Sequence, residues 1–346
     1  MKSRLTLPAN YTPLLDLRDT ERAIKFIKDG FQNRFSVNLN LQRVSAPLIV
    51  SQKTGINDYL NGWEEPARFN IRDMNEAGEI VQSLAKWKRQ ALADYGFAPL
   101  EGLYTDMNAI RPDETLDNLH SLYVDQWDWE RVMQPNERNL NFLKEIVTKI
   151  YGVIRATEVD VCLHYPQIGS SILPPNIYFT HSETLEALYP DKNPKEREDA
   201  VCKEHGAVFV IGIGHDLKGD SPHDGRAADY DDWSTPTSDG HRGFNGDILI
   251  WNPLLERAFE LSSMGIRVDA DSLKRQLSIR HEEEKASLPF HQRLLNGELP
   301  QTIGGGIGQS RLCMFFLRKA HIGEIQVSIW PQEMIDICAR HGIQLL

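Results

Sequence analysis

A glycine-rich segment followed by an arginine, residues 304–311, carries the clearest chemical pattern in the sequence. Its spacing is G-x-G-x-G-x-x-R, and an amphipathic helix with Leu312, Phe315 and Phe316 is expected to follow it. Glycines let a backbone pass close to a flat or phosphorylated ligand, and the arginine can stack on a base or pair with phosphate. We interpret the segment as a ligand-binding element; a flexible turn before a helix is the alternative.

A second segment combines Arg111 with a polar and aromatic stretch at residues 120–130. Polar and apolar residues alternate in part of it, which suits two antiparallel strands joined by a loop. Gln126 and Asp128 are two residues apart, so they would face the same side of a strand. The alternative is the exposed face of a hairpin, although interleaved tryptophans and carboxylates are unusual on a plain surface.

Acidic residues further along the chain could bind a cation. Asp247 lies on an expected strand, and Glu260, Ser262 and Met264 would share one side if their segment is extended. Mg²⁺ commonly binds one or two carboxylates together with substrate phosphates. Residues 223–233 are acidic, aromatic and rich in turn formers, so they should form a loop that is either a solvated charge cluster or a binding segment.

Several common catalytic and nucleotide-binding motifs are absent from the sequence. It contains no G-x-x-x-x-G-K-[ST], no G-x-G-x-x-G that opens a βα turn, and no G-x-S-x-G. These absences argue against a P-loop enzyme, a Rossmann dehydrogenase and an α/β-hydrolase.

The hydrophobic pattern predicts the elements that must position these residues. Helices are expected at residues 19–35, 139–156, 271–280 and 289–297, the first capped by Asp19 or Thr20. Strands are expected at residues 44–50, 207–213, 247–251 and 325–330, and Pro47 indicates an edge or a boundary. Because helices interrupt the strands irregularly, we expect an α+β fold with an antiparallel sheet rather than a doubly wound sheet.

Composition limits the possible partners and the compartment. The 346 residues include 38 Lys+Arg and 49 Asp+Glu, a formal net charge of −11, which argues against broad nucleic-acid binding and against an anionic membrane surface. The four widely spaced cysteines indicate reduced thiols, and the N-terminus lacks the apolar region of a signal peptide. We therefore expect a cytoplasmic protein, and the lack of a linker favours one domain.

Three segments, in the correct order, resemble the signature motifs of the class II aminoacyl-tRNA synthetases. Residues 304–311 resemble the third motif, and Arg111 with Glu114 and the following strand resembles the second. Glu114 stands three residues after Arg111, where the usual spacing is two. Residues 44–49 are similar to the first motif, which joins two subunits.

Longer blocks resemble one family, the ammonia-dependent aspartate–ammonia ligases of the asparagine synthetase A type. These blocks are residues 81–90, 123–130, 229–234, 260–267 and 302–311, with Trp330-Pro331 near the end. The resemblance implies a class II synthetase-like catalytic core, an antiparallel sheet flanked by helices, as a single domain over residues 1–346 with an extension at 1–18. It also implies a homodimer, and asparagine synthesis from aspartate, ammonia and ATP through a β-aspartyl-adenylate, with Mg²⁺, AMP and pyrophosphate.

The resemblance also implies roles for individual residues. Arg111 and Arg311 would stabilise the charge that develops at the phosphate, and Asp58 would meet ammonia and accept a proton. The residues implied to hold aspartate are Ser83, Lys88, Gln126, Asp128, Asp231 and Arg267. Those implied to hold ATP are Arg111, Ser121, Arg226, Asp247, Ser263, Gly306, Gly308 and Arg311. Asp247 and Glu260 are the implied metal ligands.

Three other functions compete with this one. A tRNA-charging enzyme of the aspartyl or asparaginyl type would need a tRNA-binding module, but the expected core occupies nearly the whole chain. The second is a non-catalytic relative that only binds amino acids or nucleotides. Such a relative would be expected to lack Arg111 or Arg311, but both are present. A glutamine-dependent ligase would need a nucleophilic cysteine in a suitable context, which the sequence lacks, so ammonia is the expected nitrogen donor.

Overall fold

A large sheet forms the centre of the computed structural model, which describes residues 4–60, 64–219 and 221–346. The strands of this sheet lie in the order β1-β5-β6-β11-β10-β9-β8-β7. Their bounds are β1 Leu41–Arg43, β5 Gly102–Ile110, β6 Tyr123–Val132, β7 Tyr178–His181, β8 Ala207–Ile211, β9 Asn245–Asn252, β10 Arg257–Ile266 and β11 Thr302–Gly308. The inner pairings are antiparallel, whereas β1 pairs with β5 and β7 with β8 in parallel.

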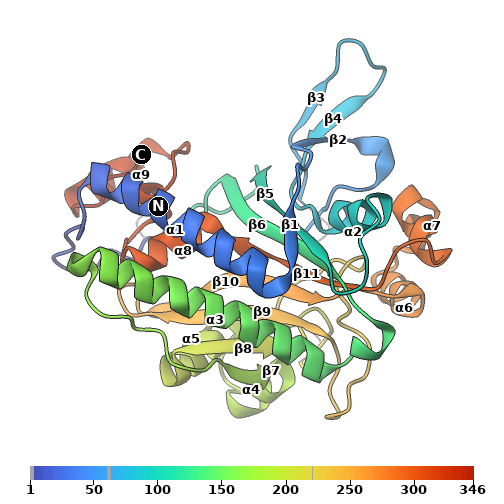
Figure 1. Ribbon diagram of the computed structural model, residues 1–346. Coiled ribbons are helices and arrows are strands. Elements are labelled where there is room, and N and C mark those ends of the chain that lie inside the picture. The colour runs from blue at the N-terminus through green and yellow to red at the C-terminus, as the bar shows by residue number, and fades with distance from the viewer. Residues whose placement is uncertain (1–3, 61–63, 220) are drawn as a thin grey trace.

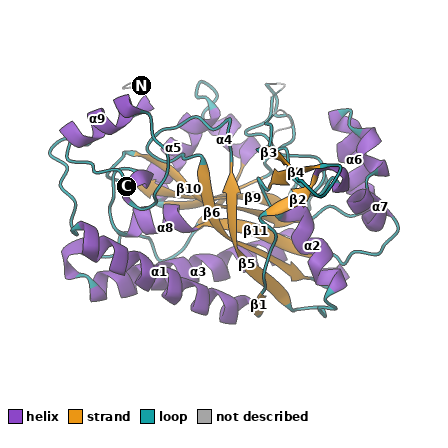
Figure 2. Cartoon of the chain, turned by 90° about the horizontal axis from the view of Figure 1, so that it is seen from above, coloured by secondary structure: helices purple, strands orange, loops and turns teal. Residues whose placement is uncertain are grey.

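Helices cover both faces of this sheet. Figures 1 and 2 show α1 and α3 side by side along one face, with α4 and α5 on the other. The helices are α1 Leu17–Leu39, α2 Ala85–Asp94, α3 Leu140–His164, α4 Ser182–Leu188, α5 Pro194–His205, α6 Ala270–Arg280, α7 Pro289–Leu295, α8 Gln309–Phe316 and α9 Gln332–Arg340. The α+β prediction with a largely antiparallel sheet is confirmed. Within the described residues no helix is both long and apolar enough to cross a membrane.

The alternation of residues along β6 decides which face of the sheet becomes core. Trp127 and Trp129 are fully buried on the α1 side, where Phe31 stacks on Trp127 with ring centroids 4.4 Å apart. Successive side chains on a strand point to opposite faces, so Gln126 and Asp128 face away from α1. The predicted common side of these two residues is confirmed, and the interleaved tryptophans anchor the strand.

A second, three-stranded sheet projects from the main body, as Figure 1 shows. It has the order β2-β4-β3, with β2 Ile49–Ser51, β3 Arg68–Asn70 and β4 Ala77–Ile80. The single strand predicted at residues 44–50 is therefore wrong, because β1 ends at Arg43 and β2 begins at Ile49. Pro47 lies in the gap, where its missing N–H cannot interrupt a ladder.

Three other local predictions needed correction. The strand predicted at residues 325–330 is wrong, because a short 3₁₀ turn, Ile322–Glu324, is followed there by irregular chain. Residues with high β-propensity do not form a strand unless another strand lies beside them to pair with. The helix predicted at 19–35 begins earlier, and Asp16 caps it by accepting the N–H of Asp19 at 2.8 Å. The helix predicted at 139–156 continues to His164. Those at 271–280 and 289–297 agree with α6 and α7 to within two residues.

The N-terminal segment before α1 packs against a loop between β5 and β6. Asn118 accepts the N–H of Thr6 at 2.7 Å and donates to the carbonyls of Thr6 and Ala320, at 2.9 and 2.7 Å. The carbonyl of Asn118 accepts the N–H of Ile322 at 2.8 Å. The described part of the 1–18 extension thus holds together two chain segments, residues 118–122 and 320–326, that reach the pocket described next.

Candidate active site

A cavity of about 470 Å³ opens on the face of the main sheet away from α1 and α3. The floor comes from β6, β10 and β11. The walls come from Asp58, Leu60 and Glu64 and from the loops at residues 111–121 and 224–231. Of the site residues predicted from the sequence, all of them described by the structure, only Asp247 stays outside the lining. Residues that lie far apart in the chain therefore meet in one cavity.

The glycines of residues 304–308 form strand β11 in the middle of the sheet. The alternative interpretation as a flexible turn is therefore wrong. A Cβ at Gly304 would overlap the carboxylate of Glu130, and a Cβ at Gly306 would overlap the side-chain oxygen of Gln126. These two glycines leave room for the polar side chains of β6 to lie over the neighbouring strand, in addition to the close approach of a ligand that their small size allows.

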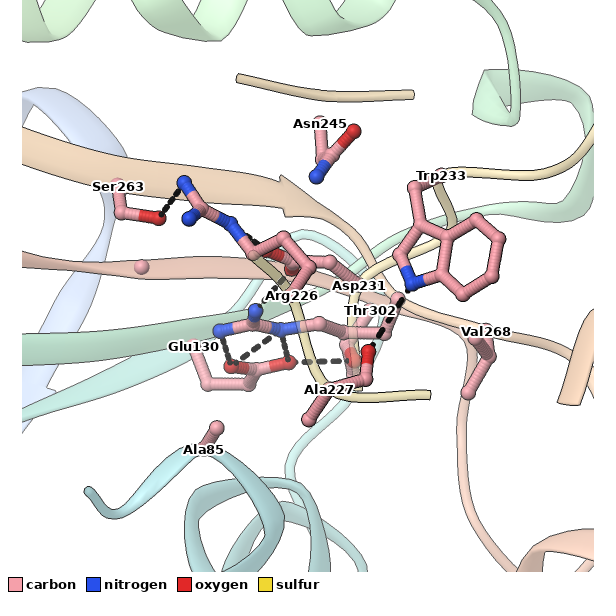
Figure 3. Close-up of polar contacts among 12 residues, drawn as sticks. Ala85, Glu130, Arg226, Ala227, Asp231, Trp233, Asn245, Ser263, Val268 and Thr302 are labelled. Atoms are coloured by element: carbon pink, nitrogen blue, oxygen red, sulfur yellow. Dashed lines mark hydrogen bonds and ion pairs between the residues drawn. The ribbon is translucent and has the colours of Figure 1, made fainter. Parts of the chain in front are cut away.

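A buried ionic network fills the floor of the pocket. Arg267 donates to both carboxylate oxygens of Glu130 at 2.9–3.1 Å, and it also forms an ion pair with Asp231. Thr302 donates to Glu130 at 2.6 Å; Figure 3 shows Glu130, Thr302 and Asp231 gathered there. Burial alone would raise the pKa of Glu130, but the positive charges of Arg267 and Lys88 bring it below its ordinary value.

Glu130 was missed by the sequence analysis although it organises this network. It follows Gln126 and Asp128 at the same two-residue spacing, so the alternation along β6 would have placed it on the pocket face. A carboxylate buried at 0% exposure needs partners of this quality, because an unpaired buried charge is strongly unfavourable. We interpret Glu130 as the residue that holds the guanidinium of Arg267 in place.

Lys88 lies at 1% exposure beneath the same network. Its ammonium forms an ion pair with Asp128 and donates to the carbonyls of Trp129 and Gly305 at 3.0 and 3.1 Å. Burial lowers the pKa of Lys88, and the charge of Asp128 opposes that effect. All three donors of the ammonium therefore have protein partners, so a substrate carboxylate would have to compete with Asp128 for Lys88.

Arg226 connects the loop at residues 223–233 to the adjacent strands. It forms an ion pair with Asp247 and donates to the hydroxyl of Ser263 at 2.8 Å. Figure 3 shows this arginine reaching from its loop to Ser263. Burial raises the pKa of Asp247, the charge of Arg226 lowers it, and the charge of Glu260 raises it again. The two carboxylates predicted as metal ligands thus repel each other, which a bound cation would relieve.

A β-bulge changes which residues of β10 face the pocket. The pairing with β9 shifts between Glu260 and Ser262, so Glu260 and Ser263 both lie on the pocket face, whereas Met264 is buried in the core. The prediction that Glu260, Ser262 and Met264 share one side is therefore wrong. A bulge adds one residue to a strand and re-aims the side chains beyond it, and simple alternation could not have shown it.

Arg111 and Arg311 retain hydrogen-bond donors that face the pocket. Arg111 donates from Nη2 to the carbonyl of Gln82 at 3.3 Å, and its buried Nε has no partner among the described residues. Arg311 donates from Nη1 to the carbonyl of Glu260 at 3.1 Å. Buried donors without partners are rare in folded proteins and ask for an explanation, and an anionic ligand would supply one.

Asp58 is 2% exposed and lines the pocket wall opposite this floor. Its carboxylate accepts the N–H of Leu60 at 2.9 Å, so Asp58 also stabilises the local turn. Burial raises the pKa of Asp58 to about 6, although the positive charge of Lys86 opposes the shift. Lys86 in turn pairs with Asp229 at 3.0 Å, and His291 contacts the same oxygen at 3.0 Å.

The remaining predicted residues also lie along the pocket. Ser83 accepts the N–H of Ala85 at 3.1 Å just before α2, and the hydroxyl of Ser121 contacts that of Ser328 at 2.8 Å. Gly308 ends β11 where a Cβ would press on the side chain of Arg311. The segment at 223–233 is a loop, as predicted. The ion pairs of Arg226 and Asp231 are buried, which argues against the alternative of a solvated charge cluster.

Comparison of the sequence with known proteins gives one family. A family profile described as "Aspartate-ammonia ligase" matches residues 18–342. A protein of Parabacteroides distasonis named aspartate–ammonia ligase is 59% identical over 345 residues, which cover 99% of this chain and 100% of that protein. Proteins of the same name from Bacteroides fragilis and Clostridium perfringens are each 57% identical, and the alignments cover 99% of this chain and 100% and 99% of theirs.

Solved structures of similar fold are class II aminoacyl-tRNA synthetases. The asparaginyl-tRNA synthetase of Entamoeba histolytica in complex with asparaginyl-adenylate gives a TM-score of 0.65 at 15% identity, covering 90% of this chain and 66% of that one. The enzyme of Pyrococcus horikoshii with the same ligand gives 0.65 at 14% identity, with 90% and 70% covered. At these identities the likeness concerns the fold, and this chain spans about two thirds of the synthetases' length.

Proposed function

This chain belongs to the aspartate–ammonia ligase family, and from that premise we propose how its pocket carries out the reaction. The chain is an enzyme that uses ATP to join aspartate and ammonia into asparagine. The observation that carries our proposal is the division of the pocket into two parts along β6. A buried ionic network lies beside the middle of the strand, and two arginines with available donors lie at its beginning.

The arginines fit the adenylation step. The β-carboxylate of aspartate and the α-phosphate of ATP are both anionic, so their approach needs preorganised positive charge. Strands β5 and β11 end opposite Tyr123 and Gln126 of β6, so Arg111 and Arg311, which follow those ends, belong to the same end of the sheet. We propose that Arg111 contacts both reacting groups and that Arg311 contacts the phosphates, with release of pyrophosphate and formation of a β-aspartyl-adenylate.

The rest of the nucleotide site follows from the same placement. We assign ATP binding to five further residues that line the pocket, namely Ser121, Arg226, Ser263, Gly306 and Gly308. Asp247 would act through Arg226, with which it is paired. Ser121 belongs to the segment that Asn118 ties to the N-terminal residues, so the extension supports this wall.

The ionic network fits the α-ammonium and α-carboxylate groups of aspartate. One oxygen of Asp231 pairs with Arg267, and the other lies 3.9 Å from Nε of Arg226. We propose that this second oxygen, with Asp128, receives the α-ammonium group of the substrate. The α-carboxylate would then take the place of Asp128 at Lys88, helped by Ser83 and Gln126, so substrate binding exchanges one carboxylate for another without leaving a buried charge unpaired.

Mg²⁺ fits the acidic group beside the arginines. We propose that Glu260 and Asp247 hold the ion together with ATP phosphates, as Mg²⁺ usually binds one or two carboxylates and substrate oxygens. The mutual repulsion of these two carboxylates supports this assignment. Asp247 would have to share or release Arg226. The ion would neutralise phosphate charge as pyrophosphate leaves.

Ammonia is proposed to enter beside Asp58. This carboxylate is buried, lines the pocket and has a pKa of about 6, so it is ionised near neutral pH. An ionised carboxylate can bind an ammonium ion and accept its proton, which leaves neutral ammonia to attack the β-carbonyl. AMP then leaves and asparagine remains.

The products test this proposal. Incubation with aspartate, ammonium, ATP and Mg²⁺ should yield asparagine and AMP in equal amounts, measured together by chromatography. Glutamine in place of ammonium should support little turnover. Three of the four described cysteines are buried, and none stands in the sequence context of a glutamine-cleaving nucleophile. Formation of ADP and phosphate in step with asparagine would contradict adenylation.

We also propose a homodimer joined through the region that resembles the first class II motif. The apolar stripe of α1 is used inside the subunit, where Ile27, Phe31 and Phe35 are fully buried. Apolar side chains remain exposed nearby, at 81% for Val37, 49% for Leu48 and 47% for Ile49. Light scattering should give a mass near twice 39.5 kDa; a fully active monomer at micromolar concentration would refute the assignment.

Two further proposals concern the chain as a whole. We propose that residues 1–346 act as a single catalytic domain, since the predicted site draws on segments from Asp58 to Arg311. We also propose a cytoplasmic location, which the unpaired cysteines support because disulfides are rare in that compartment.

A further inference from the structure

Three histidines and a glutamate gather at the β7 edge of the main sheet, outside the lining of the catalytic pocket. They are His181 at the end of β7, Glu183 in α4, and His215 and His241 in loops. Figure 1 shows β7 and α4 at the edge of the sheet remote from the projecting β2–β4–β3 sheet. Glu183 and His215 line a separate cavity of about 420 Å³ whose lining shares no residue with the catalytic pocket.

Three of these residues have the spacing of metal ligands. One ligand atom from each of His181, Glu183 and His241 lies within 4.8 Å of the other two. Nδ1 of His241 is 3.4 Å from Oε2 of Glu183. Ligand atoms bound to one tetrahedral Zn²⁺ at about 2.0–2.1 Å are roughly 3.4 Å apart, so this pair already has the separation that a shared ion requires.

The surrounding hydrogen bonds match those that support metal ligands. Nε2 of His181 lies 2.8 Å from the carbonyl of Arg242, to which it donates, and this fixes the ring and leaves Nδ1 with its lone pair. His215 lies with Nε2 3.1 Å from Oε1 of Glu183, the carboxylate oxygen opposite the one near His241. Ligating histidines commonly donate their second nitrogen to a backbone carbonyl, and ligating carboxylates are commonly hydrogen-bonded on their other oxygen.

We propose that His181, Glu183 and His241 form a binding site for a divalent transition metal of the Zn²⁺ class, separate from the Mg²⁺ site assigned to catalysis. Two imidazoles and one carboxylate are a ligand set of Zn²⁺ with one position left for water. Mg²⁺ and Ca²⁺ prefer oxygen ligands and are expected to bind poorly here. The ion would link the start of α4 to the loop at residues 235–242.

Binding requires a small rearrangement that the structure makes possible. The rings of His181 and His241 stack with centroids 4.2 Å apart and an interplanar angle of 12°, so one ring must turn for both nitrogens to face one ion. The side chain of His241 is 29% exposed and lies in a loop, so it is the one that turns. Nδ1 of His181 would give up only a 3.2 Å contact with the N–H of Glu183.

The test is direct titration of the metal-free enzyme with Zn²⁺ by calorimetry and with Co²⁺ by visible absorption. We expect one binding site for these ions in addition to any in the catalytic pocket. Co²⁺ at this site should show the intense absorption bands of four-coordinate geometry, and excess Mg²⁺ should not displace the bound ion. Glu183→Gln and His241→Ala should weaken Zn²⁺ binding at this site at least roughly 10-fold, and His215→Ala, which removes a supporting hydrogen bond, roughly 10-fold.

His205→Ala is the matched control, because the side chains of His205 and His241 have the same 29% exposure and His205 lies outside the cluster. It should leave Zn²⁺ and Co²⁺ binding unchanged. If the wild-type enzyme takes up neither ion at micromolar concentration, or if folded Glu183→Gln and His241→Ala proteins bind as well as the control, the proposal is wrong. Circular dichroism of each variant identifies the folded ones, and His241→Gln provides a second substitution at the exposed position.

Discussion

Arg111→Lys should lower the rate of asparagine formation by about 10²–10³-fold while leaving the fold intact. Within the part of the chain that the structure describes, Arg111 has a buried Nε without a partner, and its Nη2 makes a 3.3 Å hydrogen bond to a backbone carbonyl. A guanidinium can offer parallel donors to a carboxylate and a phosphate at once, whereas lysine presents a point charge on a flexible stem. Initial rates at saturating aspartate, ammonium and ATP give the comparison.

Arg43→Lys is the control for this prediction. Arg43 pairs with Asp106 at 2.8 Å, its side chain is 58% exposed, and it lies outside the pocket lining. We expect its activity to match that of the wild type. Near-normal turnover in a folded Arg111→Lys enzyme would contradict the contacts with both reacting groups that we assign to Arg111. It would imply that Arg311 or the metal ion stabilises the developing charge.

Asp58→Asn should separate the two halves of the reaction. The first half needs aspartate, ATP and Mg²⁺, and the second needs neutral ammonia. We expect the variant to retain aspartate-dependent exchange of pyrophosphate into ATP but to lose asparagine formation at ordinary ammonium concentrations. Raising the pH should restore part of the activity, because more ammonia is then free without help from a carboxylate.

The substitution is well suited to distinguish chemistry from structure. Asparagine keeps the Oδ1 atom that accepts the N–H of Leu60, so the turn at Asp58 is preserved and only the charge is removed. If exchange is lost in a folded protein, Asp58 binds aspartate or ATP rather than ammonia. If both half-reactions fall together with thermal stability, the turn was its only role.

The raised pKa of Asp58 gives this variant a stability signature. The folded carboxyl has a pKa of about 6 and the ordinary value is 3.8, so between these values the folded protein holds a proton that the unfolded chain has released. The free energy of unfolding therefore decreases as the pH rises through this window. Asp58→Asn should remove that decrease and be at least as stable as the wild type at neutral pH. The wild-type second half-reaction should also fall below about pH 6 as Asp58 becomes protonated.

The sequence predicted those parts of the site that depend on regular alternation or on a recognisable family block. The common face of Gln126 and Asp128 followed from the two-residue period of a strand, and the same period extends to Glu130. The gathering of Arg111, Arg226 and Arg311 in one pocket could be expected only through the resemblance, since strand order is set by pairings between distant segments.

Irregular features were beyond the reach of the sequence patterns. The bulge in β10 re-aimed Ser263 and Met264, and nothing in the local sequence marks the extra residue. Residues 325–330 have strand-like composition but no strand beside them. The role of Gly304 and Gly306 depends on the bulk of the side chains on β6 across the pairing, a contact that neither segment reveals alone.

The β-aspartyl-adenylate is tested most directly by following an oxygen atom from aspartate that is labelled with ¹⁸O in its β-carboxylate. If that carboxylate attacks the α-phosphate beside Arg111 and Arg311, ammonia must then displace AMP, and one labelled oxygen leaves with it. We predict that each asparagine formed is matched by one AMP carrying a single ¹⁸O in its phosphate, seen by mass spectrometry, with unlabelled pyrophosphate. Label in inorganic phosphate with formation of ADP, or asparagine formed alongside unlabelled AMP, would contradict the β-aspartyl-adenylate and the roles that we assign to the two arginines.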